Sequence, residues 1–319
     1  MATVIGISGA WKDVLQQLQR AHVVVSHPDE ISEQLLVLKQ KYAVQLKNNQ
    51  IQCDKQLAKL LVERDDQLKQ VETDILKLEQ TRVGIFGSIV KWFKQWFLQA
   101  RKRNIIDSYQ HRQVQIERRT LEDETITSQY RTISQVENVL NSTVFTGSRA
   151  ELAVIEILSQ LPPAYYVLND VRLRAKHRLE FNHKVVQSAQ IDHLVVAPTG
   201  VFVVEVKNWS QHFANSGKFF DPYEQVGRAN YLCHCLLKED LGIKMTVRSI
   251  LAYQGHIPLQ PKDSKYIKVL PIEKITGYVR WFERQTPVLS AAQVENIVKE
   301  FHPQTSHNMS REVQPWEFI

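Results

Sequence analysis

After Pro28, the chain contains no proline before residue 162, and residues 29–140 contain only two glycines, Gly84 and Gly87. Proline breaks helices and glycine weakens them, so a stretch nearly free of both is typical of long uninterrupted helices. The two glycines mark the natural break. We therefore expect an antiparallel helical hairpin over residues 28–140, with arms of about 45 to 50 residues, each about 70 Å long at ~1.5 Å per residue.

Apolar residues before this break recur at alternating spacings of three and four, which is the pattern of a coiled-coil seam. They are Leu57, Leu61, Leu68, Val71, Ile75 and Leu78, with Arg64 as the one polar member. The returning arm repeats the pattern less regularly. Two outcomes remain open: a homodimer formed through the coiled-coil hairpin, and a monomeric hairpin closed on itself.

The tip of the hairpin combines aromatic and basic residues in one helical stretch. Its large apolar residues are Phe86, Ile89, Val90, Trp92, Phe93, Trp96, Phe97 and Leu98, and Arg101, Lys102 and Arg103 follow directly. Such a composition suits a helix that lies at a membrane surface or docks on a protein partner. The alternative is that these aromatic residues pack against the first arm or against a second copy.

Composition and charge narrow the function classes. A length of 319 residues favours two domains, and 40 Lys and Arg against 34 Asp and Glu gives a net charge of +6. The surplus is spread over both halves, so a nucleic-acid role has to rest on local clusters. Cys53, Cys233 and Cys235 fit neither a disulfide framework nor a zinc site. Without a secretory pattern or an apolar run of roughly 18 residues, we expect a cytoplasmic protein, with a position peripheral to a membrane left open.

The composition changes after residue 140, where prolines, turn residues and short β-branched runs predict an α/β domain. Strands are expected at residues 165–171, 190–197, 201–207, 245–253 and 266–270. Helices are expected at residues 148–160, 221–239 and 291–301. The chain thus divides into a lead segment (1–27), a helical hairpin (28–140) and an α/β domain (141–319).

Charged residues interrupt two of these apolar strands. Asp192 lies inside one strand, while Glu205 and Lys207 lie two apart in the next and so share a face. A two-residue loop would set Asp192 opposite Lys207, and a four-residue loop would set it opposite Glu205. Either places all three on one face, whereas a three-residue loop would turn Asp192 away.

At strand ends, two carboxylates can hold Mg²⁺ or Mn²⁺, while an ammonium group can position the attacking water. The alternative is a structural pair between Asp192 and Lys207, with Glu205 exposed.

An ordered set of motifs carries a family resemblance. They are Gly147-Ser148-Arg149-Ala150-Glu151, Leu168-Asn169-Asp170-Val171, Gln190-Ile191-Asp192-His193, and the run from Gly200 to Asn208 that contains Glu205-Val206-Lys207. Over about residues 145–242 the chain resembles the nuclease-related domain (NERD) family of the PD-(D/E)XK nuclease superfamily. It departs from the family at Val206, where threonine is common, and at Gln211, where glycine is frequent. The resemblance implies a restriction-endonuclease-like mixed sheet flanked by helices.

The resemblance also implies roles for single residues. Asp192 and Glu205 would be ligands of Mg²⁺ or Mn²⁺, and Lys207 would be the catalytic lysine. Glu151 would be an acidic helix residue that faces the site, and Gln225 would lie near the substrate phosphates. Glu151 has a competing interpretation, because Ser148 to Glu151 also has the sequence of a helix capping box.

A basic segment precedes the Asp192 strand. Arg172, Arg174, Lys176 and Arg178 lie in it, and the first three alternate with apolar residues. One face of an extended hairpin could therefore follow a phosphate backbone. A solvated charged loop is the alternative.

Together these features predict a metal-dependent nuclease that hydrolyses phosphodiester bonds, with DNA as its substrate and partner. Two alternatives stay open. The first is a nucleic-acid-binding module that does not cleave, and the second is a coiled-coil interaction protein at a membrane surface.

Overall fold

The computed structural model describes residues 1–82, 84–216, 221–257 and 265–302, without the side chains of Ile85, Phe86 and Leu121. The chain forms two compact units, one made of Met1–Pro28 with Asn138–Ile319 and the other of Asp29–Glu137. Residues 1–27, which the sequence set apart as a lead segment, therefore belong to the unit that contains the β-sheet.

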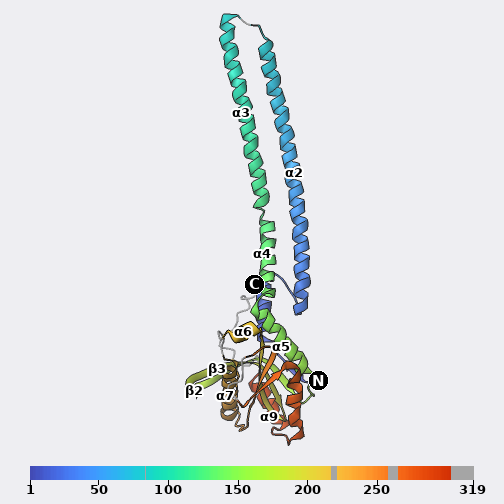
Figure 1. Ribbon diagram of the computed structural model, residues 1–319, viewed down its shortest axis with the longest axis vertical. Coiled ribbons are helices and arrows are strands. Elements are labelled where there is room, and N and C mark those ends of the chain that lie inside the picture. Colours follow the sequence, from blue (N-terminus) through green and yellow to red (C-terminus); the bar gives the residue numbers. More distant parts are fainter. Residues whose placement is uncertain (83, 217–220, 258–264, 303–319) are drawn as a thin grey trace. The chain divides into compact units, whose positions relative to one another are not determined.

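Three long helices account for the hairpin unit: α2 (Pro28–Gln80), α3 (Ile85–Leu121) and α4 (Glu124–Leu140). The second arm runs antiparallel to α2 (Figure 1). Side-chain pairs between the arms show this, since residue numbers in the second arm rise as those in α2 fall. These pairs are Lys102–Glu72 at 2.6 Å, Asn49–Asp123 at 2.8 Å and Gln129–Gln45 at 2.7 Å. The predicted break lies where expected, since Gly84 is the N-cap of α3, but Gly87 is inside that helix.

A second break, which the sequence did not predict, separates α3 from α4 at Asp123. Its Oδ1 accepts hydrogen bonds from the backbone N–H groups of Thr125 at 2.8 Å and Ile126 at 3.4 Å. A carboxylate that satisfies the first free N–H groups starts a new helix. The returning arm is therefore two helices, which explains its less regular apolar pattern.

Part of the apolar seam is covered within one chain. Val71 is 1% exposed and packs with Leu60 of α2 against Ile105 and Tyr109 of α3. Leu61, by contrast, is 45% exposed. The second arm therefore buries one side of α2 and leaves another side to solvent.

The other unit is built on a six-stranded sheet in the order β1-β2-β3-β4-β5-β6. Its strands are β1 (Thr3–Ile5), β2 (Tyr166–Phe181), β3 (Lys184–Ala197), β4 (Gly200–Trp209), β5 (Arg248–Gly255) and β6 (Ile267–Pro271). The pairs β2–β3 and β3–β4 are antiparallel, and β1–β2, β4–β5 and β5–β6 are parallel. The predicted mixed sheet is confirmed.

Helices bury both faces of this sheet. On one face lie α7 (Pro222–Asp240) and α9 (Ala291–Glu300), and on the other lie α5 (Thr143–Ser159) and α8 (Ile275–Trp281). Because both faces are covered, the central strand β4 is buried from Gly200 to Val206. Local signals start these helices as expected, since Asp221 caps α7 and Ser290 forms a capping box with Gln293 on α9.

The N-terminal segment completes the sheet unit. The strand β1 pairs with β2, and the helix α1 (Gly9–Arg20) packs on α5. A short helix, α6 (Gln211–Asn215), follows β4. Two 3₁₀ turns, Ile272–Lys274 and Phe282–Arg284, flank α8. In the part of the chain that the structure describes, no helix has the length and apolar character needed to cross a bilayer.

Candidate active site

A tight turn sets the register of the two strands that carry the charged residues. Val196 pairs with Val201 and Ala197 with Gly200, so only Pro198 and Thr199 remain in the turn. Gly200 adopts φ +135°, which residues with a side chain rarely adopt. His193 pairs with Val204, and the next step of this register sets Asp192 opposite Glu205. The position of Asp192 opposite Glu205 is the one expected for a four-residue loop. The additional pair between Ala197 and Gly200 shortens that loop to two residues without changing the register.

Asp192, Glu205 and Lys207 come together across these two strands. The Nζ of Lys207 lies 2.5 Å from Glu205 Oε1, and Oδ2 of Asp192 accepts a hydrogen bond of 2.8 Å from the backbone N–H of Val206. Glu205 is only 1% exposed, so the alternative of an exposed Glu205 is wrong. The other oxygen of Glu205, Oε2, is buried and has no hydrogen-bond partner among the described residues.

Burial and mutual repulsion shift the pKa values of the cluster. Burial raises the pKa of Glu205 to about 8, and repulsion from Asp192 contributes. The pKa of Asp192 is also raised, chiefly by burial, while the charge of Lys207 opposes the rise. Burial would lower the pKa of Lys207, but Glu205 and Asp192 outweigh it, so its pKa is raised. Lys207 is therefore an ammonium ion at neutral pH.

Glu151 joins the cluster from α5. The helix begins at Thr143 with Ser142 as its N-cap, so Ser148 lies inside it and donates to the carbonyl of Phe145. The capping-box interpretation of Glu151 is therefore wrong. Burial raises the pKa of Glu151 to about 7, with a further contribution from Asp192. A carboxyl group with this pKa exchanges its proton near neutral pH.

The partner of Glu151 is a residue that the sequence analysis did not single out. Ser8 Oγ donates a 2.6 Å hydrogen bond to Glu151 Oε2, and the backbone N–H of Ala10 lies 3.4 Å from the same oxygen. Ser8 is the N-cap of α1 and accepts a hydrogen bond from the N–H of Trp11. The carboxylate thus lies at the positive end of a helix. A serine before an amphipathic helix was the only sequence signal, and it pointed to capping alone.

Two motif residues of β2 hold the N-terminal segment in place. Asn169 donates to the carbonyl of Gly6 at 3.0 Å, and Asp170 lies 2.7 Å from Nζ of Lys12 and accepts from Gln190 at 2.7 Å. Asp170 has φ +53°, an uncommon conformation for a residue with a side chain. These contacts give the Leu168-Asn169-Asp170-Val171 motif a physical role, which is to fix Ser8 and α1 beside the site.

His193 is a buried core residue, as its position next to Asp192 in the strand predicts. Its Nδ1 lies 2.7 Å from Asn169 Oδ1, and its Nε2 has no hydrogen-bond partner among the described residues. Burial lowers the pKa of His193 to about 3. The imidazole is therefore neutral, and it supports the strand that carries Asp192.

The carboxylates suit a divalent cation that takes only one or two ligands from the protein. No set of three or more His, Cys, Asp and Glu side chains among the described residues is placed to hold a metal together. The unpartnered oxygen of Glu205 and the repulsion of its carboxylate by Asp192 and Glu151 are nevertheless what a bound cation would relieve. Mg²⁺ commonly takes one or two carboxylates and completes its shell with water and substrate phosphate. Asp192 and Glu205 suit that arrangement.

Gln225 lies on α7. It faces a pocket of about 450 Å³ that is also lined by Lys184, Asp221, Glu224 and Arg228. No hydrogen bond among the described residues joins it to Asp192, Glu205 or Lys207. Its expected place near substrate phosphates stays a prediction.

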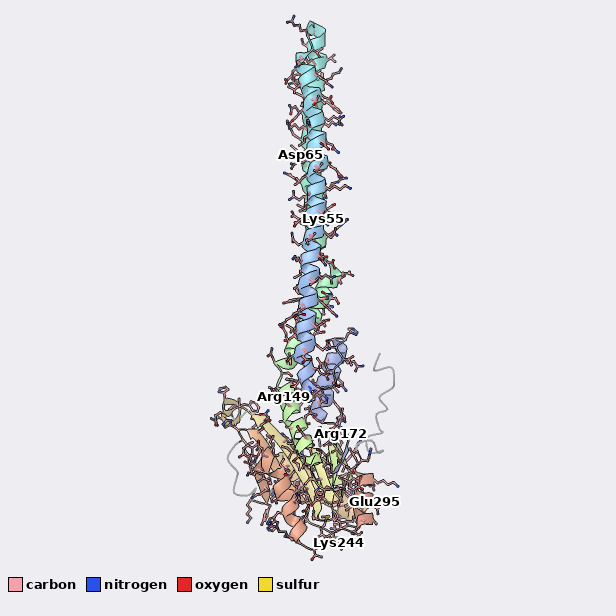
Figure 2. The ribbon with its side chains drawn as sticks, turned by 90° about the vertical axis from the view of Figure 1, so that its right-hand side faces the viewer. Lys55, Asp65, Arg149, Arg172, Lys244 and Glu295 are labelled. Carbon is pink, nitrogen blue, oxygen red and sulfur yellow. The ribbon has the colours of Figure 1, made fainter. Side chains whose placement is uncertain are left out.

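The basic residues of β2 point to solvent. Arg172, which Figure 2 labels, and Arg174, Lys176 and Arg178 are all exposed, on a strand and not in the irregular loop of the alternative interpretation. Lys176 is engaged, because its Nζ lies 2.6 Å from Asp240 at the end of α7. Arg172 lies 3.9 Å from Asp170 through Nε. An exposed basic row therefore begins beside the motif that holds α1.

Comparison with known proteins finds similarity over part of the chain. An uncharacterized protein of Bacillus anthracis is 40% identical over 73 residues, which cover 23% of this chain and 31% of the relative. The chain thus spans about a third of the length of that curated relative. The crystal structure of protein VC1899 from Vibrio cholerae aligns with 47% of this chain and 36% of its own, at 14% identity and a TM-score of 0.25. That similarity is too low to bear on the fold.

A family model gives the more direct result. Residues 146–254 match the model of the nuclease-related domain, NERD. The matched span runs from the first turns of α5 through β5, so it includes Glu151, Asp192, Glu205 and Lys207. Over this span the chain matches the nuclease-related domain, as its motifs predicted.

Proposed function

We propose that the sheet unit is a divalent-metal-dependent nuclease that hydrolyses phosphodiester bonds in DNA. The observation that carries this proposal is the environment of buried Glu205. Its Oε1 contacts Lys207, whereas its Oε2 has no hydrogen-bond partner among the described residues, and the charge of Asp192 acts on the same carboxyl group. A buried carboxylate oxygen without a hydrogen-bond partner costs stability, so a purely structural ion pair gains nothing from it. A site that binds a cation, by contrast, needs a carboxylate oxygen that is free to coordinate it.

The residues divide the chemistry between them. Asp192 and Glu205 would hold Mg²⁺ or Mn²⁺, which offsets phosphate charge and acidifies bound water when present. Lys207, charged at neutral pH, orients the attacking water and a phosphate oxygen. Glu151, whose pKa is about 7, is suited to exchange a proton with water near neutral pH. Arg172 and Arg174 supply exposed charge for the sugar-phosphate backbone.

Cleavage of supercoiled plasmid, linear duplex and matched RNA by the full chain tests the proposal. The assay is run with Mg²⁺, Mn²⁺ and chelator. Lys207→Ala, Asp192→Asn and Glu205→Gln should each lower the rate by about 100-fold or more, the scale expected for a group that assists proton transfer. Lys244→Gln, an exposed change in the same unit (Figure 2), is the matched control. Full activity in two of the three site variants would refute the assignment.

A binding module that does not cleave is the second candidate. It is favoured by one observation, that fewer than three side chains are placed to share a metal among the described residues. Tight DNA binding with no cleavage in either metal, unchanged by Lys207→Ala, would select this function in place of the first.

A further inference from the structure

The start of α3 presents an apolar face to solvent, formed by Ile89, Val90, Trp92, Phe93, Trp96 and Phe97. Trp92, Phe93, Trp96 and Phe97 are 61%, 58%, 62% and 63% exposed. At about 100° per residue the six side chains fall within an arc of about 160°. The side chain of Phe86, which the sequence placed in the same set, lies outside the described part.

The opposite side of the same helix makes the contacts with α2. Lys102 pairs with Glu72 at 2.6 Å, and Leu98 joins the apolar cluster around Val71. Lys91 donates to the carbonyls of Glu79 at 2.8 Å and Thr81 at 3.1 Å. The hairpin therefore forms without burying the aromatic residues, and the expectation that they pack against the first arm is wrong for this face.

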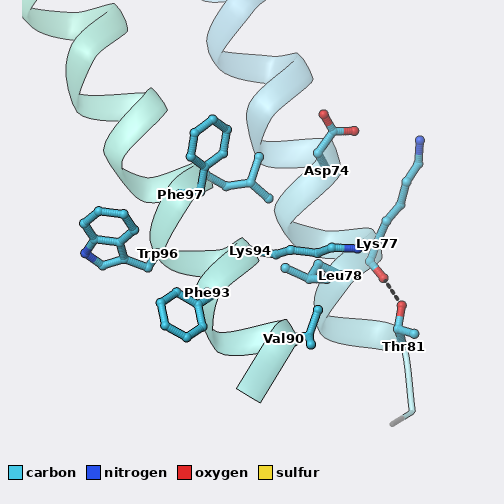
Figure 3. A pocket seen from close by; sticks show the side chains of 10 residues that line it. Asp74, Lys77, Leu78, Thr81, Val90, Phe93, Lys94, Trp96 and Phe97 are labelled. Atoms are coloured by element: carbon cyan, nitrogen blue, oxygen red, sulfur yellow. Dashed lines mark hydrogen bonds between the residues drawn. The ribbon is translucent and has the colours of Figure 1, made fainter. Parts of the chain in front are cut away.

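A groove of about 750 Å³ runs along one edge of the aromatic face. Val90, Phe93 and Phe97 line it from α3, and Lys77 and Leu78 line it from α2. Figure 3 shows Trp96 pointing away from α2, while Lys94 extends towards α2 over Leu78. The aromatic face thus continues into an apolar groove that is also lined by two lysines, Lys77 and Lys94, and by Asp74.

The charge around this surface indicates what kind of partner binds it. From Glu72 to Arg103 the sequence has seven Lys and Arg residues and three acidic residues, Glu72, Asp74 and Glu79, so this surface has a net positive charge. A second copy laid on this face would bring like charges together, which opposes self-association. A surface of negative charge with apolar material directly beneath it matches both properties, and tryptophan prefers that boundary.

We propose that the aromatic face of α3 binds the surface of bilayers that contain anionic phospholipid. The Trp and Phe rings enter the outer part of the acyl-chain region, and Lys94, Arg101 and Arg103 stay at the head groups. The helix lies in the plane of the interface. No described helix is suited to cross the bilayer.

Vesicle flotation of the full chain tests this binding. Phosphatidylcholine vesicles are compared with vesicles that also contain phosphatidylserine, and the protein should float with the anionic vesicles alone at physiological salt. Trp96→Ser with Phe97→Ser should weaken binding at least tenfold. The matched control is Val62→Ser with Val114→Ser, whose side chains are 62% and 60% exposed elsewhere on the hairpin, and it should bind as the unmodified chain does.

The electrostatic part is tested separately. Lys94→Gln with Arg101→Gln should weaken binding several-fold and reduce its dependence on salt. Lys55→Gln with Lys59→Gln removes the same charge from exposed positions of α2, where Figure 2 labels Lys55, and should change neither. Brominated lipid should quench fluorescence from Trp92 and Trp96, and the quenching should disappear when both are changed to Phe.

Other outcomes overturn the proposal. Equal flotation of the control and the Trp96→Ser, Phe97→Ser variant would show that the face does not bind lipid. Loss of self-association in that variant, measured by sedimentation without any flotation, would assign the face to a second copy. Flotation must be unchanged in Lys207→Ala, so a failure here stays distinct from a failure of the nuclease assignment.

Discussion

Ser8 and Glu151 lie 143 positions apart in the sequence and share a 2.6 Å hydrogen bond from the serine hydroxyl to Glu151 Oε2. The bond joins the N-terminal cap of α1 to the acidic residue that α5 brings to the site. It opposes the rise in the pKa of Glu151 that burial and Asp192 cause. The N-terminal segment is therefore part of the candidate site.

Removal of the Ser8 hydroxyl should remove a hydrogen bond of Glu151 and leave the hydrogen bonds of Asp192 and Glu205 in place. We expect Ser8→Ala to slow cleavage by about 10-fold, in line with the loss of a residue that orients a catalytic group. The pKa of Glu151 should rise, because the missing hydrogen bond favoured its charged form, so the rising limb of the pH–rate profile should move to higher pH.

Helix capping alone would not produce that shift. Ser290→Ala removes the N-cap of α9 in the same unit, at a similar cost of about 1 kcal/mol, and serves as the control. Ser8→Thr keeps the hydroxyl and should retain the profile. If Ser8→Ala and Ser290→Ala lose activity equally and with unchanged profiles, Ser8 only caps α1.

Metal binding should release protons. Glu205 and Glu151 have pKa values of about 8 and about 7, so both carry protons for part of the time at pH 7. A divalent ion binds the ionised form, so its binding expels protons and strengthens from pH 6 to pH 8. Calorimetry with Mn²⁺ in buffers of different ionisation enthalpy measures the release. Glu205→Gln should abolish the binding, and a proton count of zero in the unmodified chain would contradict the prediction.

The exposed arginines should contribute to DNA affinity by neutralising phosphates. We expect Arg172→Gln with Arg174→Gln to weaken binding and to lower the slope of log K against log salt by about 0.9 for each phosphate that is no longer neutralised. Lys244→Gln with Arg284→Gln removes the same charge from exposed positions outside β2 and is the control. Lys176 is engaged by Asp240, so Lys176→Gln should have the smaller effect. An unchanged slope would show that the row does not touch phosphate.

His193 should make the fold sensitive to acid. Its pKa is about 3 in the folded chain and about 6.5 when unfolded, so the unfolded state binds a proton first as the pH falls. The stability it contributes is complete above pH 6.5 and is lost towards pH 3, at about 1.4 kcal/mol per pH unit. Glu151 and Glu205 act in the opposite direction, because their raised pKa values favour the folded state as the pH falls below 7.

The comparison with His193→Gln isolates this contribution. Between pH 6.5 and pH 4.5 the free energy of unfolding of the unmodified chain should decrease relative to that of the variant, because Glu151 and Glu205 contribute equally to both. His183→Gln, at a side chain 99% exposed, is the control and should follow the unmodified chain. Urea unfolding at a series of pH values gives these energies, and parallel curves for His193→Gln and the unmodified chain would contradict the burial argument.

The sequence determined what depends on short-range pattern. The proline-free stretch up to residue 140 predicted the helical hairpin, and short, nearly continuous apolar runs predicted the β3 and β4 strands, with Asp192, Glu205 and Lys207 on them. These predictions succeed because helix and strand periods, and the even count of a tight turn, are local properties. They also carried the motifs of the nuclease-related domain.

Only the tertiary structure decided which distant groups meet. The Ser148 to Glu151 spacing predicted a capping box equally well, and Ser142, six residues earlier, starts the helix instead. Nothing near Ser8 in the sequence indicates Glu151 as its partner, and β1 is too short to be seen as a strand before it pairs with β2. Burial likewise depends on every element packed around a group. Packing around Glu205 buries it and raises its pKa, whereas no described element covers the aromatic face of α3.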